Sequence, residues 1–169
     1  MRVRLLEHAT LPPGVTSFFR DHLPPPFAPQ TPEPWAMPAH WGLDRLRQQL
    51  DAAKLLDALP QPEQGEAILA VIGSDLFLPV LTYVFGASVL GHRRSVLSVA
   101  RLQPTNGDRT VFRRRVVVEA LHELGHGLGL VHCPLASCPM HQAFHPEAVD
   151  LKEPTYCPAC SRAVWRLTG

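Results

Sequence analysis

The chain has 169 residues, a hydrophobic content of 46% and a formal net charge of +1 at pH 7, which is typical of one folded domain and unlike disordered or fibrous chains. The balanced charge shows no global basic bias, so we expect no nucleic-acid partner. No run approaches the roughly 18 apolar residues of a membrane span, and early charges leave no room for a signal peptide, so we expect a cytoplasmic monomer without membrane contact.

The N-terminal part combines two short regular elements with a proline-rich connection. Residues 3–6 predict a first strand, and residues 15–23 predict a short helix after a proline–glycine turn. Residues 24–38 contain too many prolines for a helix or a strand ladder. We interpret them as an irregular surface connection anchored by Phe27 and Trp35. A polyproline ligand for a partner protein is the alternative.

The middle of the chain predicts a helix, a strand and a turn. Residues 43–59 predict one amphipathic helix, because leucines recur there at near-helical spacing. Residues 67–72 are continuously apolar and predict a central strand buried on both faces. Residues 73–77 predict a turn in which the aspartate hydrogen-bonds its own backbone. The leucine stripe comprises Leu43, Leu46, Leu50, Leu55 and Leu59, and the aspartate is Asp75.

Two more strands and a long helix follow. Residues 82–89 and residues 95–102 predict strands, because both are rich in β-branched and apolar side chains. The helix after them is expected to be capped by Asp108 or Thr110. Its basic run, residues 113–115, is interpreted as a solvated face rather than a site for an acidic ligand or nucleic acid.

The motif HExxHxxGxxH lies in the second half of this helix and just beyond it. His122 and His126 are four residues apart and share one helix face, the usual arrangement for two zinc ligands. Glu123 lies one step around the helix, where its carboxylate can reach a water molecule. Gly129 can adopt a left-handed conformation, end the helix and bring back His132 as a third ligand. Three protein ligands leave a coordination position for water, which is typical of catalytic zinc.

Four cysteines occur as two pairs close to the histidine motif. Cys133 and Cys138 follow the third histidine directly, and Cys157 and Cys160 lie downstream. Because no secretory signal is visible, this arrangement favours a second, structural zinc site with four thiolates over two disulfides, which are the alternative. Such a site would tie the chain after the helix to the C-terminal tail. We therefore expect two zinc ions per chain, one catalytic and one structural.

These motifs carry a resemblance to a known family. HExxHxxGxxH followed by Met140 resembles the metzincin clan of zinc peptidases, and the cysteine pattern resembles the archaemetzincins within that clan, with a slightly shorter loop before Cys157. The resemblance implies a compact metzincin-like α/β (α+β) fold with a mixed twisted β-sheet, an active-site helix and a zinc-stapled C-terminal segment. It implies one catalytic domain over residues 1–169. Residues 1–132 would hold the sheet and helices, and residues 133–169 the methionine turn and cysteine segment.

The resemblance also implies roles around the cleft. Met140 would occupy the methionine turn and form an apolar floor beneath the histidines without binding zinc. In metzincins an edge strand forms the upper rim and pairs with extended substrate. We assign that rim to Phe85, Gly86 and Ala87, with a simple strand bend at the glycine as the alternative. Tyr156 could stabilise an oxyanion, but its position before a cysteine favours a packing role.

The predicted function is zinc-dependent hydrolysis of peptide bonds in a peptide or protein substrate. A zinc-activated water would attack, with Glu123 as general base. One alternative is a metal-dependent endoribonuclease, because a bacterial family of rRNA-processing proteins uses a similar histidine triad, although it lacks this glutamate and the four cysteines. The other is a non-catalytic zinc-binding scaffold protein. The sequence leaves open the substrate and the choice between endopeptidase and aminopeptidase action.

Overall fold

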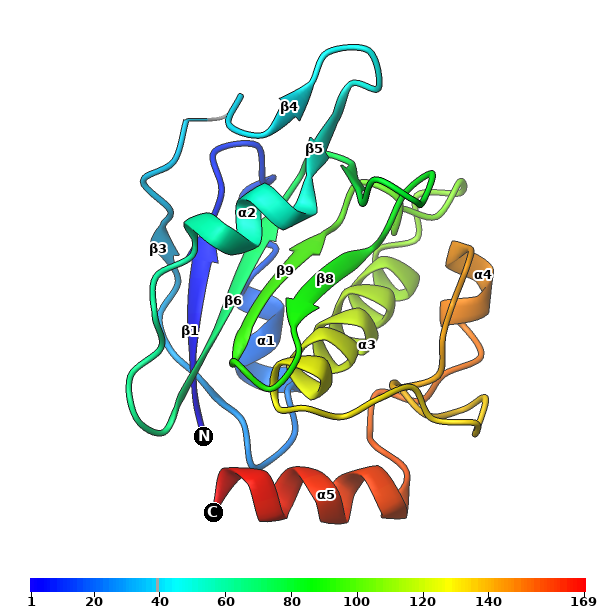
Figure 1. Ribbon diagram of the computed structural model, residues 1–169. Helices are drawn as coiled ribbons and strands as arrows, with labels where there is room; N and C mark the ends of the chain where they lie inside the picture. The colour runs from blue at the N-terminus through cyan, green and yellow to red at the C-terminus, as the bar shows by residue number, and fades with distance from the viewer. Residues whose placement is uncertain (39) are drawn as a thin grey trace.

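The computed structural model of the protein describes residues 1–38 and 40–169 as a mixed α/β fold (Figure 1). Within these residues the main sheet has six strands, in which β1, β6, β9 and β8 are neighbours in that order and β2 and β3 both pair with β1. Its pairs are parallel except that of β8 with β9. A smaller sheet contains β4, β5 and β7. The strands are Arg2–Glu7 (β1), Ala28–Pro29 (β2), Glu33–Pro34 (β3), Leu43–Asp44 (β4), Gln49–Asp51 (β5), Glu66–Ile72 (β6), Leu76–Phe77 (β7), Gly86–Val89 (β8) and Arg94–Ser98 (β9), and the helices are Ser17–His22 (α1), Ala52–Ala58 (α2), Arg109–Gly127 (α3), Pro146–Val149 (α4) and Pro158–Thr168 (α5).

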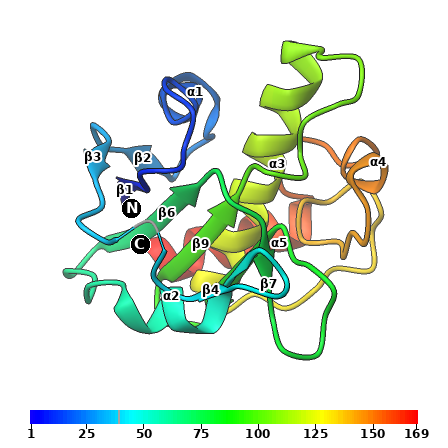
Figure 2. The same ribbon diagram turned by 90° about the horizontal axis from the view of Figure 1, so that it is seen from above.

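Helices cover both faces of the main sheet (Figure 2). α3 packs on β6, β8 and β9, and α1 packs beside α3, whereas α2 packs on β8 and β9 from the opposite face. The strand β6 supplies both cores, because its side chains alternate between the faces. Leu69 and Val71 join the core under α3, and Ile68, Ala70 and Ile72 join the core under α2. All of β6 is buried, so the predicted central strand is confirmed.

The proline-rich connection is more regular than predicted. The first strand and the helix α1 agree with the predictions for residues 3–6 and 15–23. Residues 24–38, however, contain β2 and β3, which lie parallel to β1. The ladder forms because residues between the prolines supply the N–H donors: Ala28 donates to Met1 O and Gln30 to Val3 O, each at 2.8 Å. Prolines are tolerated at such an edge.

The single helix predicted over residues 43–59 is wrong. The chain forms the hairpin of β4 and β5 first, and α2 begins only at Ala52. The Asp44 carboxylate accepts hydrogen bonds from the backbone N–H groups of Leu46 and Arg47, which closes a turn in place of a helical one. Leu46 is 99% exposed, so the leucine stripe does not form one buried face.

The strands predicted over residues 82–89 and 95–102 are shorter than expected. β8 begins at Gly86 instead of being interrupted there, and β9 ends at Ser98. The predicted turn at residues 73–77 includes the short strand β7. Asp75 accepts a hydrogen bond from the adjacent backbone N–H of Leu76 at 3.1 Å, as predicted for that turn.

The helix α3 is capped by Asp108, whose side chain accepts hydrogen bonds from Thr110 N and Val111 N. The interpretation of its basic run as a solvated face is wrong for Arg115. That side chain is 5% exposed and forms two hydrogen bonds with the Asp150 carboxylate, at 2.8 and 2.7 Å. The ion pair could not be predicted because its partner lies 35 residues away.

The C-terminal segment wraps around the end of α3 and finishes in α5, which runs below the sheet in Figure 1. Val149 and Val164 of this segment belong to the same core as β6 and α3. None of the helices in the described part of the chain has the length and apolar character that a bilayer crossing requires.

Candidate active site and cysteine cluster

Three imidazole rings converge at the end of α3. His122 and His126 occupy successive turns of the helix, and their Nε2 atoms are 3.1 Å apart. The ring of His132 lies 5.3 Å from that of His122 and 4.9 Å from that of His126, between centroids. One nitrogen from each ring lies within 4.8 Å of the other two. These rings could therefore share one metal ion.

The return of His132 depends on a glycine. Gly129 has a φ angle of +102°, which is unfavourable for residues with a Cβ atom. The backbone N–H of Leu130 donates to Gly125 O at 2.9 Å, so the chain turns back over the last turn of α3. This turn has the form that the motif predicts.

The hydrogen bonds of the rings leave the Nε2 atoms of two histidines available for a metal. His122 Nδ1 donates to Pro139 O, and His126 Nδ1 donates to Leu130 O, each at 2.7 Å. A carbonyl can only accept, so the proton lies on Nδ1 and the Nε2 lone pair points into the site. Burial lowers the pKa of His122 to about 3 and also lowers the pKa of His126, so both rings are neutral near pH 7. This donor set suits zinc.

Glu123 lies beside the histidines and is held by the edge strand. Ser88 Oγ on β8 donates to Glu123 Oε2 at 2.6 Å and also lies 2.9 Å from Ser95 Oγ. Gly86 allows this approach, since a Cβ atom there would lie 2.6 Å from Glu123 Cγ. Burial raises the pKa of Glu123 to about 8. The sequence prediction missed Ser88, because nothing in the local pattern links it to a residue 35 positions away.

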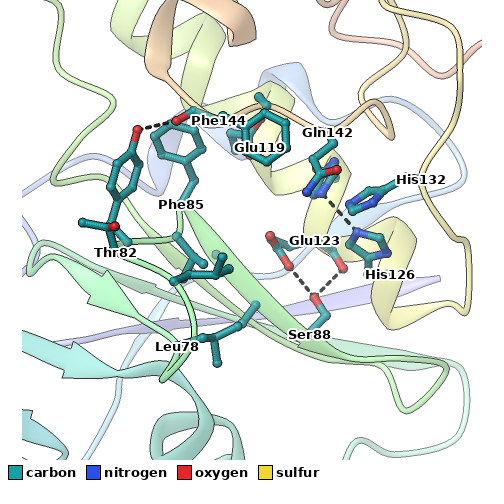
Figure 3. A pocket seen from close by; sticks show the side chains of 17 residues that line it. Leu78, Thr82, Phe85, Ser88, Glu119, Glu123, His126, His132, Gln142 and Phe144 are labelled. Atoms are coloured by element: carbon teal, nitrogen blue, oxygen red, sulfur yellow. Dashed lines mark hydrogen bonds between the residues drawn. The ribbon is translucent and has the colours of Figure 1, made fainter.

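The histidines and Glu123 open into a cavity of about 410 Å³ between β8 and the chain that follows Met140 (Figure 3). Phe85, Gly86 and Ala87 all lie along it. Phe85 O accepts a hydrogen bond from Ser98 N at 2.7 Å. Bonded pairs alternate along an antiparallel ladder, so the backbone groups of Gly86 point away from β9, toward the free edge.

An aromatic residue links the two sides of the cavity. The hydroxyl of Tyr83 donates to Phe144 O at 2.5 Å. Phe144 lies at the end of the cavity away from His132 (Figure 3). Arg101 lies over the Tyr83 ring, 4.1 Å from its centroid, and forms an ion pair with Asp75. Asp75, which was expected only to shape a turn, therefore also holds Arg101 against Tyr83 at the wall of the cavity.

Met140 and Tyr156 both lie under the helix. Met140 is fully buried, and its sulfur packs so closely against Gly125 that a Cβ atom there would collide with it. The Tyr156 hydroxyl donates to Leu121 O at 2.5 Å. A packing role for Tyr156 therefore fits the structure better than a role at an oxyanion. His141 donates from Nδ1 to Cys133 O and lies outside the group of three rings.

The four cysteines form a second cluster in which all Sγ atoms lie within 4.8 Å of one another. All four are free thiols, and Cys133 Sγ lies 3.9 Å from Cys157 Sγ. Burial raises the pKa of Cys160 and of Cys138. Burial opposes ionisation of Cys157 too, but hydrogen bonds from Cys160 lower the pKa of Cys157 to about 7. The donor set and its spread suit a tetrahedral zinc ion.

Most of the chain matches the model of one protein family. The model of peptidase family M54 matches residues 45–166. The chain belongs to this family.

Its relatives in the family are archaemetzincins. The archaemetzincin of Methanopyrus kandleri is 38% identical over 132 residues, which cover 77% of this chain and 73% of that protein. The archaemetzincin of Halobacterium salinarum is 36% identical over 129 residues, covering 72% and 75% of the two chains. The resemblance seen in the motifs is confirmed.

Solved archaemetzincin structures share the fold of this family M54 chain. The crystal structure from Methanopyrus kandleri has a TM-score of 0.84 at 29% identity and covers 99% of this chain and 94% of its own. That from Archaeoglobus fulgidus, complexed with malonate, has a TM-score of 0.81 at 28% identity and covers 96% and 99%. The predicted fold class is confirmed, and the protein is a zinc metallopeptidase that acts on peptides.

Proposed function

We propose that His122, His126 and His132 hold a catalytic zinc ion and that Glu123 is the general base. The observation that carries this assignment is the convergence of three imidazole nitrogens within 4.8 Å, with the Nδ1 protons of two rings already engaged by backbone carbonyls. Bound zinc would supply a Lewis acid that polarises the scissile carbonyl and acidifies a water molecule.

Glu123 would accept a proton from the attacking water and later donate it. Ser88 holds Oε2 through a 2.6 Å hydrogen bond, so we assign Oε1 to accept the proton of the attacking water. The same carboxyl group would then deliver that proton to the leaving amine. Burial raises the pKa of Glu123 to about 8. A raised pKa favours the protonated form that the second step requires, and the positive charge of bound zinc would favour the ionised form that the first step requires.

The edge strand would bind the substrate backbone. We propose that an extended peptide pairs with β8 in the strand-addition mode. Gly86 is the member of the Phe85-Gly86-Ala87 segment whose backbone groups point toward the free edge. Antiparallel pairing is the more stable arrangement, so the chain after the scissile bond would run toward Tyr83 and Phe144.

A structural zinc ion would occupy the cluster of Cys133, Cys138, Cys157 and Cys160, giving two zinc ions per chain. We propose a single catalytic domain whose C-terminal segment, residues 133–169, is stapled by this ion. Met140 would support the histidines from below without binding metal. Cysteines that are not paired in disulfides suit a reducing compartment, so we propose a cytoplasmic location. We also propose that the protein is a monomer with peptide substrates and no nucleic-acid partner.

Membership of a peptidase family favours this function over the endoribonuclease alternative. The scaffold alternative lacks a role for Glu123, which is buried and held beside the three rings. Burial of an ionisable carboxyl group is unfavourable unless something compensates for it, and a catalytic role accounts for its presence.

The test combines metal analysis with a library of internally quenched peptides. Wild type is expected to hold two zinc ions and to cleave peptides. Glu123→Gln should retain both ions and lose hydrolysis. Glu147→Gln is the matched control, since that side chain is 71% exposed on α4, and it should behave as wild type. Hydrolysis by Glu123→Gln at the wild-type rate would reject the assignment.

A further inference from the structure

Lys152 is fully buried, with 0% of its surface exposed. Its ammonium group donates to Glu119 Oε1 at 2.9 Å and to Pro139 O at 3.3 Å. Glu119 is also buried and lies on α3 one turn before His122 and Glu123, where it lines the cavity. A charged pair thus lies beneath the active site and is assigned no role by the mechanism above.

The Pro139 carbonyl connects this pair to the histidines. The same oxygen that receives Lys152 Nζ also accepts the 2.7 Å hydrogen bond from His122 Nδ1. A carbonyl oxygen has two lone pairs and can accept both. The contacts therefore lead from Glu119 through Lys152 and the Pro139 carbonyl to His122. Both end residues, Glu119 and His122, lie on α3.

Stability alone is a weak explanation for this pair. Removing two charges from water costs several kcal/mol per ion, so a buried ion pair is often no better than apolar residues of the same size. The segment that carries Lys152 is already joined to α3 by Arg115 and Asp150. The geometry that distinguishes Lys152 from this second pair is its contact with the carbonyl that orients His122.

We propose that Lys152 is a positioning residue for the three-histidine site. Lys152, held by Glu119, fixes the Pro139 carbonyl, which in turn fixes the ring orientation and the Nδ1 proton of His122. The inference rests on the proposed role of His122 as a zinc ligand. Partners that orient a ligating histidine in this way typically change metal affinity by about 10–100-fold when they are removed.

The test compares three proteins. In the double variant Glu119→Gln/Lys152→Met both charges are removed together, so that neither is left buried and unpaired. Asp150→Asn is the matched control, because it breaks the other ion pair between α3 and the same segment and leaves Pro139 untouched. Thermal unfolding establishes that each protein is folded. If this double variant fails to fold, Glu119→Leu/Lys152→Met takes its place, because apolar residues of similar size often replace a buried ion pair without loss of stability.

Zinc affinity of the histidine site is measured by chelator competition with the cysteine site loaded, and no peptide is needed. The double variant is expected to lose about tenfold in affinity, and Asp150→Asn to stay close to wild type. In metal-free protein, nitrogen NMR of labelled histidine should show His122 changing from the Nδ1-protonated form to a mixture of tautomers in the double variant alone. In turnover, kcat should fall while KM changes little.

Two outcomes overturn the inference. A folded double variant with wild-type zinc affinity and an unchanged His122 tautomer would show that the pair is only structural. An equal loss of zinc affinity in Asp150→Asn would show that any loosening of the segment has the same effect. If wild type itself binds no zinc through its histidines, the proposed function fails as well, which separates that result from the other two.

Discussion

Ser88 and Glu123 join the edge strand to the active-site helix. The Ser88 hydroxyl donates to the Glu123 carboxylate at 2.6 Å and lies 2.9 Å from the Glu123 backbone oxygen. These contacts therefore fix the position of β8, which is proposed to bind substrate, relative to Glu123, which is proposed to transfer the proton. A shift of β8 would displace both together.

Ser88→Ala should lower kcat by about 10–100-fold, because the Glu123 carboxyl group loses the hydrogen bond that fixes Oε2, and misplacement of a catalytic group by about 1 Å can cost about 100-fold in rate. Within the described residues, the Ser88 hydroxyl forms hydrogen bonds with Ser95 and Glu123 and with none of the three histidine rings. The zinc content should therefore not change. Steady-state kinetics and metal analysis check this. Ser98→Ala is the control: it removes another buried serine hydroxyl, which binds Ser74 O at 2.7 Å, and should leave kcat unchanged. Equal kcat values for Ser88→Ala and wild type would contradict the assigned role of Ser88.

Gly86→Ala should abolish most activity. The added Cβ atom would lie 2.6 Å from Glu123 Cγ, so the carboxylate or the strand must move. A positional error of about 1 Å can cost about 100-fold in rate. Gly65→Ala provides the comparison, since its Cβ atom would meet nothing within 4 Å. Its φ of +74° predicts a loss of stability of about 1 kcal/mol with normal kcat. An active Gly86→Ala enzyme would show that the Glu123 position is not restrictive.

Cys157→Ser should remove one zinc ion and much of the stability. Metal binding at a structural site contributes directly to folding, and each lost kcal/mol lowers Tm by about 2–4 °C in a chain of this size. We expect Tm to fall by more than about 10 °C, with the remaining zinc at the histidines. Ser161→Ala, one turn along α5, should retain both ions. A wild-type zinc content in Cys157→Ser would argue against four-thiolate ligation.

Stability should fall in acid through the pair of Arg115 and Asp150. Hydrogen bonds from Arg115 hold the pKa of Asp150 below its usual value. The contribution is therefore complete above the unfolded-state pKa of about 4, and it is lost as the pH falls through the lower pKa of the folded protein. Urea unfolding at pH values from about 2 to about 7, which span the titration of such carboxyl groups, measures how the free energy of unfolding changes with pH.

Asp150→Asn should flatten that acid limb. Because the Asp150 side chain is 37% exposed, screening reduces the pair to about 1 kcal/mol near pH 7. The variant and wild type should converge in stability at the acid end of the series. Parallel curves for the two proteins would show that Asp150 does not contribute to acid sensitivity.

Long-range contacts account for the failed predictions. The helix expected over residues 43–59 relied on leucine spacing, but Asp44 closes a turn and Leu50 pairs with Leu76 in another part of the chain. The local pattern places Arg115 in solvent, because its partner Asp150 lies 35 residues away in the sequence. Local spacing contains no information about either partner.

The sequence by itself determined the histidine cluster, its metal class and the family. These follow from residues within one helix and one turn, where the 3.6-residue period and Gly129 specify which side chains meet. The cysteine quartet was recognisable because each pair is local. Only the tertiary structure decided that Ser88 holds Glu123, and that Lys152 reaches Glu119 and Pro139. Those side chains meet because the sheet and the C-terminal segment pack against opposite sides of α3, and that packing depends on the whole chain.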